Sequence, residues 1–376
     1  MNYRNPLLTT GILLFLILSA GCTGSAPASS SGAGASPAAG TVSSGTGTTG
    51  LGVTAGAMES VLTSTYLQLP NLDITFIDVT ITNPSDTPRV VTVESEIPGY
   101  TGKSINTVEV PAHGNITVGQ TPTLRTSAIP REITPASLHY RVALTDGTLI
   151  DEQSIPVQIY PKETMVWGFD EDGTWIDMTD FIAAWVTPHE PAIDTLVRKA
   201  AEYHPEKSMA GYQCGDTCTD AEWVADSNAQ VKAIFTALRN DYHITYINSP
   251  TAFGKGNENP QRIRLPQESL SSGSANCIDG AVLYASAIES IGMHPHIITT
   301  PSHAFTCYDA KPDADDSDNL ICLETTMTSG DSTFEQALEQ GTENYHDEIG
   351  NGNFETSASQ DLDIARLRED GILPMQ

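Results

Sequence analysis

Three consecutive pieces of residues 274–326 decide the fold: SANCIDGAVLYASAIESIGM (274–293), TTPSHAFTCY (299–308) and ICLETT (321–326). In the first piece, apolar residues recur at helical spacing after Cys277, and Ser274 and Asn276 are favoured N-cap types. Gly292 suits the left-handed residue just past a helix end. We therefore expect Cys277 in or just before a first helical turn. Unpaired N–H groups there favour a thiolate, and the side chain is expected at a groove rather than in the core.

The second and third pieces predict short β-strands. HIITT (296–300) and HAFTCY (303–308) are rich in β-forming residues and are separated by Pro301 and Ser302, and residues 320–323 form a third run. If the last two runs pair in antiparallel fashion, His303 and Glu324 lie side by side above the helix of Cys277. The three residues then match the roles of nucleophile, base and orienting acceptor. His294 and His296 are the alternative bases.

Taken together, residues 221–326 resemble the transglutaminase-like superfamily, a branch of the papain-like fold. NCIDGAVLYASAIESIGM, SHAF and LETT carry the resemblance. It implies an α+β catalytic domain acting on amide or isopeptide bonds through Cys277, His303 and Glu324. The chain departs from the family at two positions, since relatives commonly have Asp where Glu324 stands and an aromatic residue where Ile278 stands. Glutamate can accept the same hydrogen bond as aspartate.

The oxyanion donors are a further expectation from the resemblance. Related folds place a side-chain amide upstream of the cysteine, which makes Gln261 a candidate donor beside the backbone N–H of Cys277. Gln261 is equally compatible with a plain surface-loop residue. Arg262 and Arg264 either bind a substrate carboxylate or pair within the protein.

The cysteine spacing suggests disulfides rather than a metal site. Cys214 and Cys218 lie in CGDTC, where a local disulfide is favoured outside the cell. Cys307 and Cys322 fall on the strands expected to carry His303 and Glu324, and are either bonded to each other or simply buried. If both pairs form and Cys22 is lipidated, Cys277 is the thiol left over. Two local cysteines are too few for zinc, so we expect no metal and no cofactor.

The N-terminus predicts export and anchoring. Residues 11–20 form an apolar stretch too short for a mature membrane helix, and they run into LSAGC at 18–22, which resembles a lipoprotein cleavage site. We expect residues 1–22 to be a signal peptide with lipid attached to Cys22; the alternative is an uncleaved N-terminal anchor. Either way, the rest of the chain faces the outside of the membrane.

The remaining chain divides by composition. Residues 23–57 are rich in Ser, Gly, Ala and Thr and predict a disordered tether. Residues 58–160 alternate apolar and polar side chains and predict a small antiparallel β-sandwich, and residues 161–376 predict the transglutaminase-like α+β domain. Within the latter we expect helices at 191–203, 220–240, 332–340 and 362–370.

The net charge of −29 makes nucleic acid an improbable partner, because phosphate backbones require a basic surface. The preferred hypothesis is a membrane-anchored, extracytoplasmic cysteine enzyme whose substrate is a protein or peptide of the cell envelope. Hydrolysis, as in a peptidase or amidase, is favoured over transglutaminase transfer. The alternative is a non-catalytic surface lipoprotein that binds peptides or supports an envelope assembly.

Overall fold

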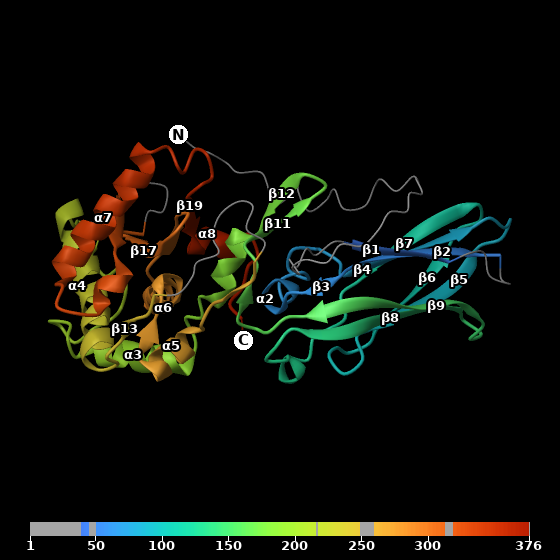
Figure 1. Ribbon diagram of the computed structural model, residues 1–376, viewed down its shortest axis with the longest axis horizontal. Coiled ribbons are helices and arrows are strands. Elements are labelled where there is room, and N and C mark those ends of the chain that lie inside the picture. The colour runs from blue at the N-terminus through green and yellow to red at the C-terminus, as the bar shows by residue number, and fades with distance from the viewer. Residues whose placement is uncertain (1–38, 45–49, 216, 249–258, 313–318, 376) are drawn as a thin grey trace, which may run out of the picture.

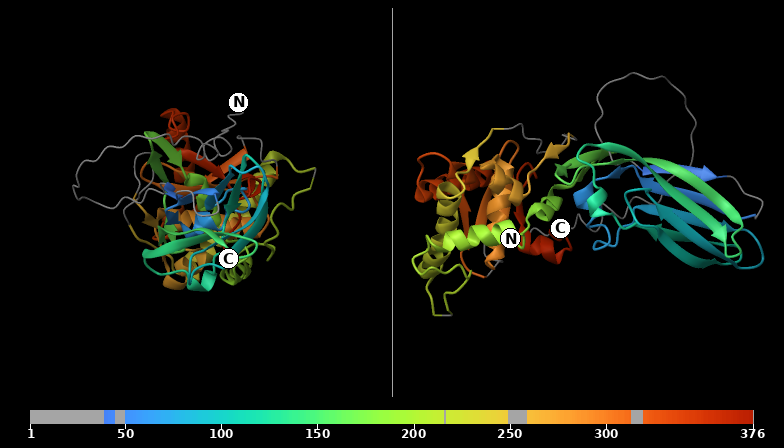
Figure 2. Two further views of the ribbon diagram at one scale, coloured as in Figure 1. Left: turned by 90° about the vertical axis from the view of Figure 1, so that its right-hand side faces the viewer. Right: turned by 90° about the horizontal axis from the view of Figure 1, so that it is seen from below.

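The molecule is elongated and has two lobes side by side. The computed structural model describes residues 39–44, 50–215, 217–248, 259–312 and 319–375. The N-terminal lobe is made of β-sheets, and the C-terminal lobe packs helices around a smaller sheet (Figure 1). The right-hand view of Figure 2 again shows the two lobes apart, whereas the left-hand view looks along the long axis and the lobes overlap. The mixture of helices and separate sheets confirms the predicted α+β class.

Two sheets face each other in the N-terminal lobe and share one apolar core. All of their strand pairs are antiparallel except that between β3 and β9. Residues inside the core, such as Val79, Val93 and Val142, alternate with outward-facing polar residues, which is the period-two pattern of the sequence. One sheet has the order β1 (Ala39–Ser44), β2 (Gly52–Met58), β4 (Ile77–Asn83), β7 (Gly114–Gln120). The other has the order β3 (Ser60–Val61), β9 (Leu149–Ile159), β8 (Thr134–Leu144), β5 (Arg89–Glu96), β6 (Ser104–Val110).

The disordered tether predicted over residues 23–57 extends too far toward the C-terminus. Residues 39–44 and 52–58 form strands β1 and β2, although both lie within or reach into the segment predicted to be disordered. The reason is visible in β2, where Val53, Ala55 and Ala57 are buried and alternate with exposed or half-buried positions. Small side chains obscured this alternation in the sequence. The signal peptide, Cys22 and residues 23–38 lie outside the described residues.

The two lobes are joined by short elements and by direct hydrogen bonds. The side chain of Gln68, just after α2 (Thr63–Tyr66), accepts a hydrogen bond from the backbone N–H of Leu373 and donates one to its carbonyl, each at 2.9 Å. The C-terminal residues are therefore held against the N-terminal lobe. The intervening chain contains β10 (Thr164–Met165), β11 (Gly168–Glu171), β12 (Thr174–Asp177) and η3 (Thr179–Trp185).

The C-terminal lobe is built on a four-stranded antiparallel sheet with the order β18-β17-β16-β19. Helix α6 (Cys277–Ser290) packs on one face of the sheet, where Thr306 donates a hydrogen bond to the Ala281 carbonyl at 3.1 Å. Helix α7 (Phe334–Gly350) packs at the other face, where Tyr345 lies against the small cluster of Ile298, Phe305 and the two sheet cysteines. The strands are β16 (Pro295–Thr299), β17 (Ala304–Asp309), β18 (Leu320–Leu323) and β19 (Gln360–Asp363).

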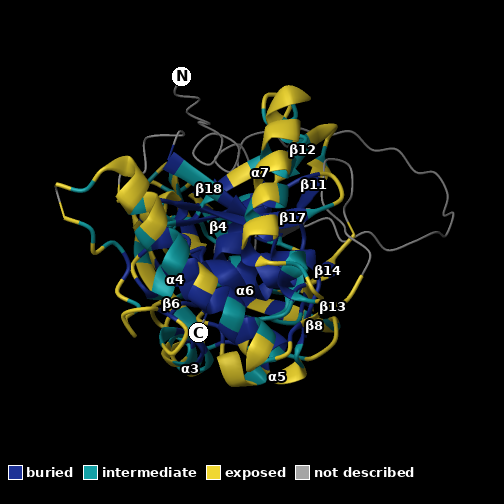
Figure 3. Cartoon of the chain, turned by 90° about the vertical axis from the view of Figure 1, so that its left-hand side faces the viewer, coloured by how far each residue is buried: buried dark blue, intermediate teal, exposed yellow. Residues whose placement is uncertain are grey.

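Helix α6 is buried in the middle of this lobe (Figure 3). Helices α3 (Pro191–Ala201), α4 (Asp220–Asn240) and α5 (Pro266–Ser272) surround it. Three further short strands lie nearby: β13 (Thr245–Tyr246), β14 (Gln261–Arg262) and β15 (Ser274–Ala275). Among the described residues, no helix combines the length and the apolarity that crossing a membrane requires.

Two predictions for the C-terminal segment were wrong. The helix expected to end at residue 340 continues to Gly350, and its N-cap is Thr333, whose side chain accepts a hydrogen bond from the Gln336 N–H. The helix expected over 362–370 is preceded by strand β19, so only α8 (Ile364–Glu369) is helical. Strand β19 was missed because three of its four residues are polar, and it is the sheet that determines its conformation.

Candidate active site

Cys277 is the first residue of helix α6. The N-cap is Asn276, whose side-chain oxygen accepts a hydrogen bond from the Asp279 N–H at 2.8 Å, and the carboxylate of Asp279 returns to the Asn276 N–H at 3.3 Å. This reciprocal pair is a capping box, which satisfies two of the free donors at a helix start. It fixes the backbone that carries the sulfur.

Arg264 makes further hydrogen bonds to residues at the start of helix α6. Its backbone N–H donates to Asp279 at 2.8 Å, and its guanidinium donates to the carbonyl and the hydroxyl oxygen of Ser274 at 3.0 Å each. Arg262 instead pairs with Glu268 at 2.9 Å. Of the two roles open for these arginines, pairing within the protein is therefore the one observed.

His303 ends the turn between β16 and β17, so the strand that was expected to begin at His303 begins one residue later, at Ala304. The turn is closed by the Thr300 N–H, which donates to the His303 carbonyl at 2.8 Å, and by the Thr300 hydroxyl, which accepts from the His303 N–H at 3.1 Å. The imidazole stacks on Phe305 with ring centres 6.1 Å apart. Its direction is thus set by the turn on one side and by an aromatic ring on the other.

Glu324 is the most firmly held of the three candidate catalytic residues, Cys277, His303 and Glu324, which together are called the group below. His303 Nε2 donates to Glu324 Oε2 at 2.7 Å, and the side-chain amide of Asn344 on α7 donates to the same oxygen at 2.9 Å. The other oxygen, Oε1, accepts hydrogen bonds from the backbone N–H and the hydroxyl of Thr326, at 3.0 and 2.5 Å. Asn344 was missed by sequence reasoning because the predicted helix ended four residues before it.

Cys277 lies close enough to His303 to affect the pKa of its imidazole. Burial lowers the pKa of His303, but hydrogen bonds to Cys277 and Glu324 and the charges of both outweigh burial and raise this pKa to about 10. Because Nε2 is engaged by Glu324, Nδ1 is the ring nitrogen free to exchange a proton with the sulfur. The arrangement therefore favours the protonated, imidazolium form of His303 at neutral pH.

The nucleophile candidate is less open than expected. Cys277 is only 3% exposed and belongs to the apolar cluster that contains Trp167 and Ile263, whereas a position at an open groove was expected. The cause is its place in the first turn of a helix that is buried on every side. The side chain of His303 remains 29% exposed, so the group reaches solvent through the imidazole.

Tyr246 stands beside the group and was not anticipated from the sequence. It lies on β13, which pairs in parallel with β15, the strand leading to Cys277. Burial raises the pKa of its phenol, and the charges of Cys277 and Glu324 raise it further, which places the ring near both residues. Tyr246 is nevertheless 41% exposed. An isolated exposed tyrosine carries no sequence signal of such a position.

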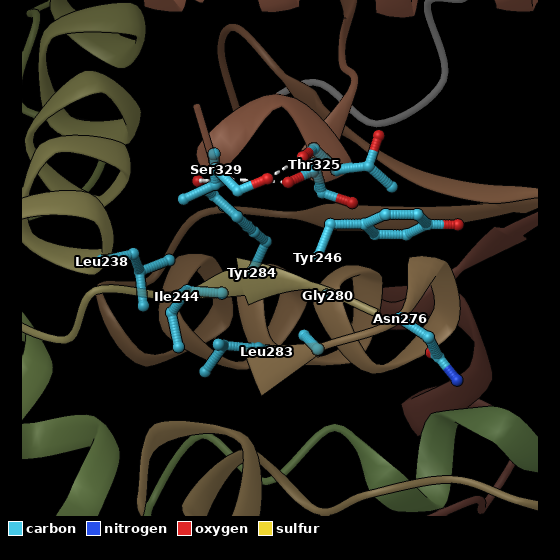
Figure 4. A pocket seen from close by; sticks show the side chains of 12 residues that line it. Leu238, Ile244, Tyr246, Asn276, Gly280, Leu283, Tyr284, Thr325 and Ser329 are labelled. Carbon is cyan, nitrogen blue, oxygen red and sulfur yellow. Dashed lines mark hydrogen bonds between the residues drawn. The ribbon is translucent and has the colours of Figure 1, made fainter. Parts of the chain in front are cut away.

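A small cavity adjoins these residues (Figure 4). Its volume is about 10 Å³, and Figure 4 shows Tyr246, Asn276, Gly280 and Thr325 around it. Asn276 precedes Cys277 and Thr325 follows Glu324, so the cavity is lined by the direct sequence neighbours of two of the three residues.

Gln261 is buried rather than exposed in a loop. It lies on β14, opposite Met165 of β10, and its side-chain oxygen accepts a hydrogen bond from the Trp167 indole N–H at 2.9 Å. This bond identifies the amide NH₂ as the end directed away from Trp167. The ring of Trp167 belongs to the same apolar cluster as Cys277.

His294 and His296 form a separate cluster. Both imidazoles face the carboxylate of Asp309, at 3.6 and 3.7 Å, and His296 Nδ1 bonds to Asp361 at 2.7 Å. Neither contributes to the group around Cys277. In the described part of the chain, no three His, Cys, Asp or Glu side chains are arranged to hold a metal ion.

The cysteines pair as the spacing suggested. Cys214 is bonded to Cys218, Cys307 is bonded to Cys322, and Cys277 is a free thiol. The second bond joins directly paired positions of β17 and β18. It therefore ties together the two strands that position His303 and Glu324.

Comparisons with known proteins give no family. No family model and no curated protein matches the chain. Among solved structures, the exo-chitosanase CsxA of Amycolatopsis orientalis is similar at 10% identity and a TM-score of 0.21, covering 68% of this chain and 30% of that one. A family 76 glycoside hydrolase from a bovine Bacteroides thetaiotaomicron strain has 9% identity and a TM-score of 0.13, covering 57% of this chain and 46% of that one. The chain thus spans less than half of either enzyme, and similarity this low carries no argument about function.

Proposed function

We propose that this chain is a cysteine enzyme of transglutaminase-like type that cleaves or exchanges amide or isopeptide bonds through Cys277, His303 and Glu324. The observation that carries the proposal is the hydrogen bond of His303 Nε2 to Glu324 at 2.7 Å, with Cys277 at a capped helix start close enough to raise the pKa of His303. A papain-like arrangement of the C-terminal lobe is part of the proposal, and its support is the order of a cysteine helix followed by two strands that end near a histidine and an acid.

The steps follow from the positions of the groups. The Cys277 sulfur attacks the substrate carbonyl carbon, and His303 transfers its proton to the leaving amine, so a thioester forms as the C–N bond breaks. Glu324 keeps the imidazole in the required tautomer and orientation. The Cys277 N–H and the Gln261 amide are the proposed donors to the oxyanion. Water or a second amine then resolves the thioester.

The setting is proposed to be the outer face of a cell membrane. The support is the sequence of residues 1–22, with Cys22 as the lipid attachment point, and the two disulfides, which are characteristic of oxidising compartments. Protein or peptide chains of the envelope are the proposed substrates. Hydrolysis is preferred to transfer, so that the activity is that of a peptidase or amidase.

A second function is favoured by the burial of the sulfur. With Cys277 only 3% exposed, the C-terminal lobe also suits a non-catalytic protein that binds peptides or supports an envelope assembly. The two functions differ in whether Cys277 forms a covalent intermediate.

The test is turnover of a mixed peptide substrate by the soluble chain from residue 39 onward, with and without an added primary amine. We expect release of new amino termini or ammonia by the wild type and none by Cys277→Ala. Equal product from both proteins, or from neither across a broad peptide set, would favour the non-catalytic function.

A further inference from the structure

The cavity lined by Asn276, Gly280 and Thr325 has the size of a single water molecule. Its volume of about 10 Å³ is close to the smallest that holds one water, given suitable polar partners. It is lined by the first turns of α6, by Tyr246 of β13 and by residues of η5 (Thr325–Thr328). No amino-acid side chain of a substrate fits this space.

One buried polar group in the cavity wall has no internal partner. The hydroxyl of Thr325 makes no hydrogen bond within the described residues, although Thr325 is only 4% exposed. Leaving a buried hydroxyl unsatisfied costs about 1–3 kcal/mol, so a ligand capable of hydrogen bonding is expected there. The neighbouring hydroxyls of Thr328 and Tyr284 are already bonded to each other.

The backbone N–H and carbonyl of Tyr246 do not take part in the pairing of β13 with β15. The N–H groups of Thr245 and Ile247 donate to the carbonyls of Gly273 and Ala275 on the β15 side. Because backbone groups alternate in direction along a strand, the N–H and carbonyl of Tyr246 face the opposite side. Strand β13 pairs with no other strand of the described chain.

The space exists because residue 280 is glycine. A Cβ at this position would lie 3.3 Å from the Thr325 hydroxyl oxygen and 3.6 Å from the Thr325 Cβ. Glycine in a helix costs about 1 kcal/mol relative to alanine. Cys277 and Gly280 are three residues apart, so they share one face of α6. The glycine thus keeps open a space on the same face as the sulfur.

We propose that this cavity holds the water that hydrolyses the acyl-enzyme, with the Thr325 hydroxyl as its anchor. This inference rests on the proposed function and deepens it, since it assigns hydrolysis rather than transfer as the basal reaction. The water oxygen attacks the thioester carbonyl carbon while one of its protons passes to His303. The C–S bond then breaks, its electron pair returns to the Cys277 sulfur, and the substrate leaves as a carboxylic acid.

The test separates acylation from deacylation with p-nitrophenyl acetate as the acyl donor. The burst of nitrophenolate reports acylation of Cys277, and the steady rate that follows reports hydrolysis. In Gly280→Ala and Thr325→Val we expect a normal burst and a steady rate lowered about tenfold or more. Thr325→Ser, which keeps the hydroxyl, is the matched conservative variant and should recover most of the steady rate that Thr325→Val loses. Added hydroxylamine should restore turnover in Gly280→Ala, because this nucleophile can approach from solvent.

The outcomes identify which claim fails. A normal burst with wild-type deacylation in both Gly280→Ala and Thr325→Val overturns the water site and leaves the triad standing. Absence of any Cys277-dependent burst in the wild type overturns the triad, and the water site with it. Thr325→Val is close in shape to threonine, so its result remains decisive if Gly280→Ala folds poorly.

Discussion

Replacing Gly341 by alanine should disturb the site from the far face of the sheet. Gly341 lies in the middle of α7, and a Cβ there would be 2.7 Å from the backbone carbon and oxygen of Cys322 and from the nitrogen of Leu323. Ordinary contacts begin near 3.4 Å, so α7 and β18 would have to separate by about 0.7 Å (3.4 − 2.7). Backbone atoms cannot rotate away as a side-chain end can.

The magnitude follows from two opposing effects. Overpacking of this kind costs about 1–3 kcal/mol, whereas exchanging glycine for alanine in a helix gains about 1 kcal/mol. Gly350, the last residue of the same helix, offers the matched control because a Cβ there meets no atom within 4 Å. Gly341→Ala should therefore unfold at lower urea concentration than the wild type, and Gly350→Ala at an equal or higher one.

The assay is urea unfolding followed by circular dichroism, combined with the rate of Cys277 alkylation. Separation of α7 from β18 moves Asn344 away from Glu324, so alkylation at pH 6 should slow in Gly341→Ala and stay unchanged in Gly350→Ala. If both variants shift the unfolding midpoint upward by similar amounts, the close approach of α7 to Cys322 is refuted.

Three further predictions concern the site and its supports. Asn344→Ala should slow Cys277 alkylation about tenfold with less than about 1 kcal/mol lost in stability, and Asn344→Gln should recover part of the rate; equal rates in all three proteins would deny Asn344 a positioning role. Because the pKa of His303 is raised from 6.5 to about 10, its charged form should stabilise the wild type fully below about pH 6.5 and progressively less up to pH 10. The stability difference between the wild type and His303→Gln should therefore shrink over that range, and a difference independent of pH would contradict the ion pair. Replacing Cys307 and Cys322 together by serine should cost about 3 kcal/mol in urea unfolding, the value for a loop of this length, and a loss below about 1 kcal/mol would count against it.

Local signals in the sequence predicted much of the site. Asn276, the periodic apolar residues after Cys277 and Gly292 gave the bounds of α6 closely, because helix ends carry chemical markers. The run of β-forming residues at 320–323 coincides with β18. The position of Glu324 at the end of this strand could therefore be predicted from local sequence. Such features depend on residues near each other in the chain.

The parts that were missed depend on distant contacts. Asn344 binds Glu324 from a helix whose length is set by packing against β18, and Tyr246 lies near the sulfur through pairing of two-residue strands. The burial of Cys277 depends on Trp167, 110 positions earlier, and on the cluster around it. No spacing rule encodes these contacts, because each is fixed only when separate elements pack.

The central claim is a thiolate held by His303, and its reactivity is the most direct measure. The soluble chain is treated with iodoacetamide at pH 6, and adducts are mapped by mass spectrometry in the wild type and in His303→Ala. The account predicts fast labelling of Cys277 in the wild type and much slower labelling in the variant. Equal, slow labelling of Cys277 in both proteins, at the rate of an ordinary buried thiol, would contradict it.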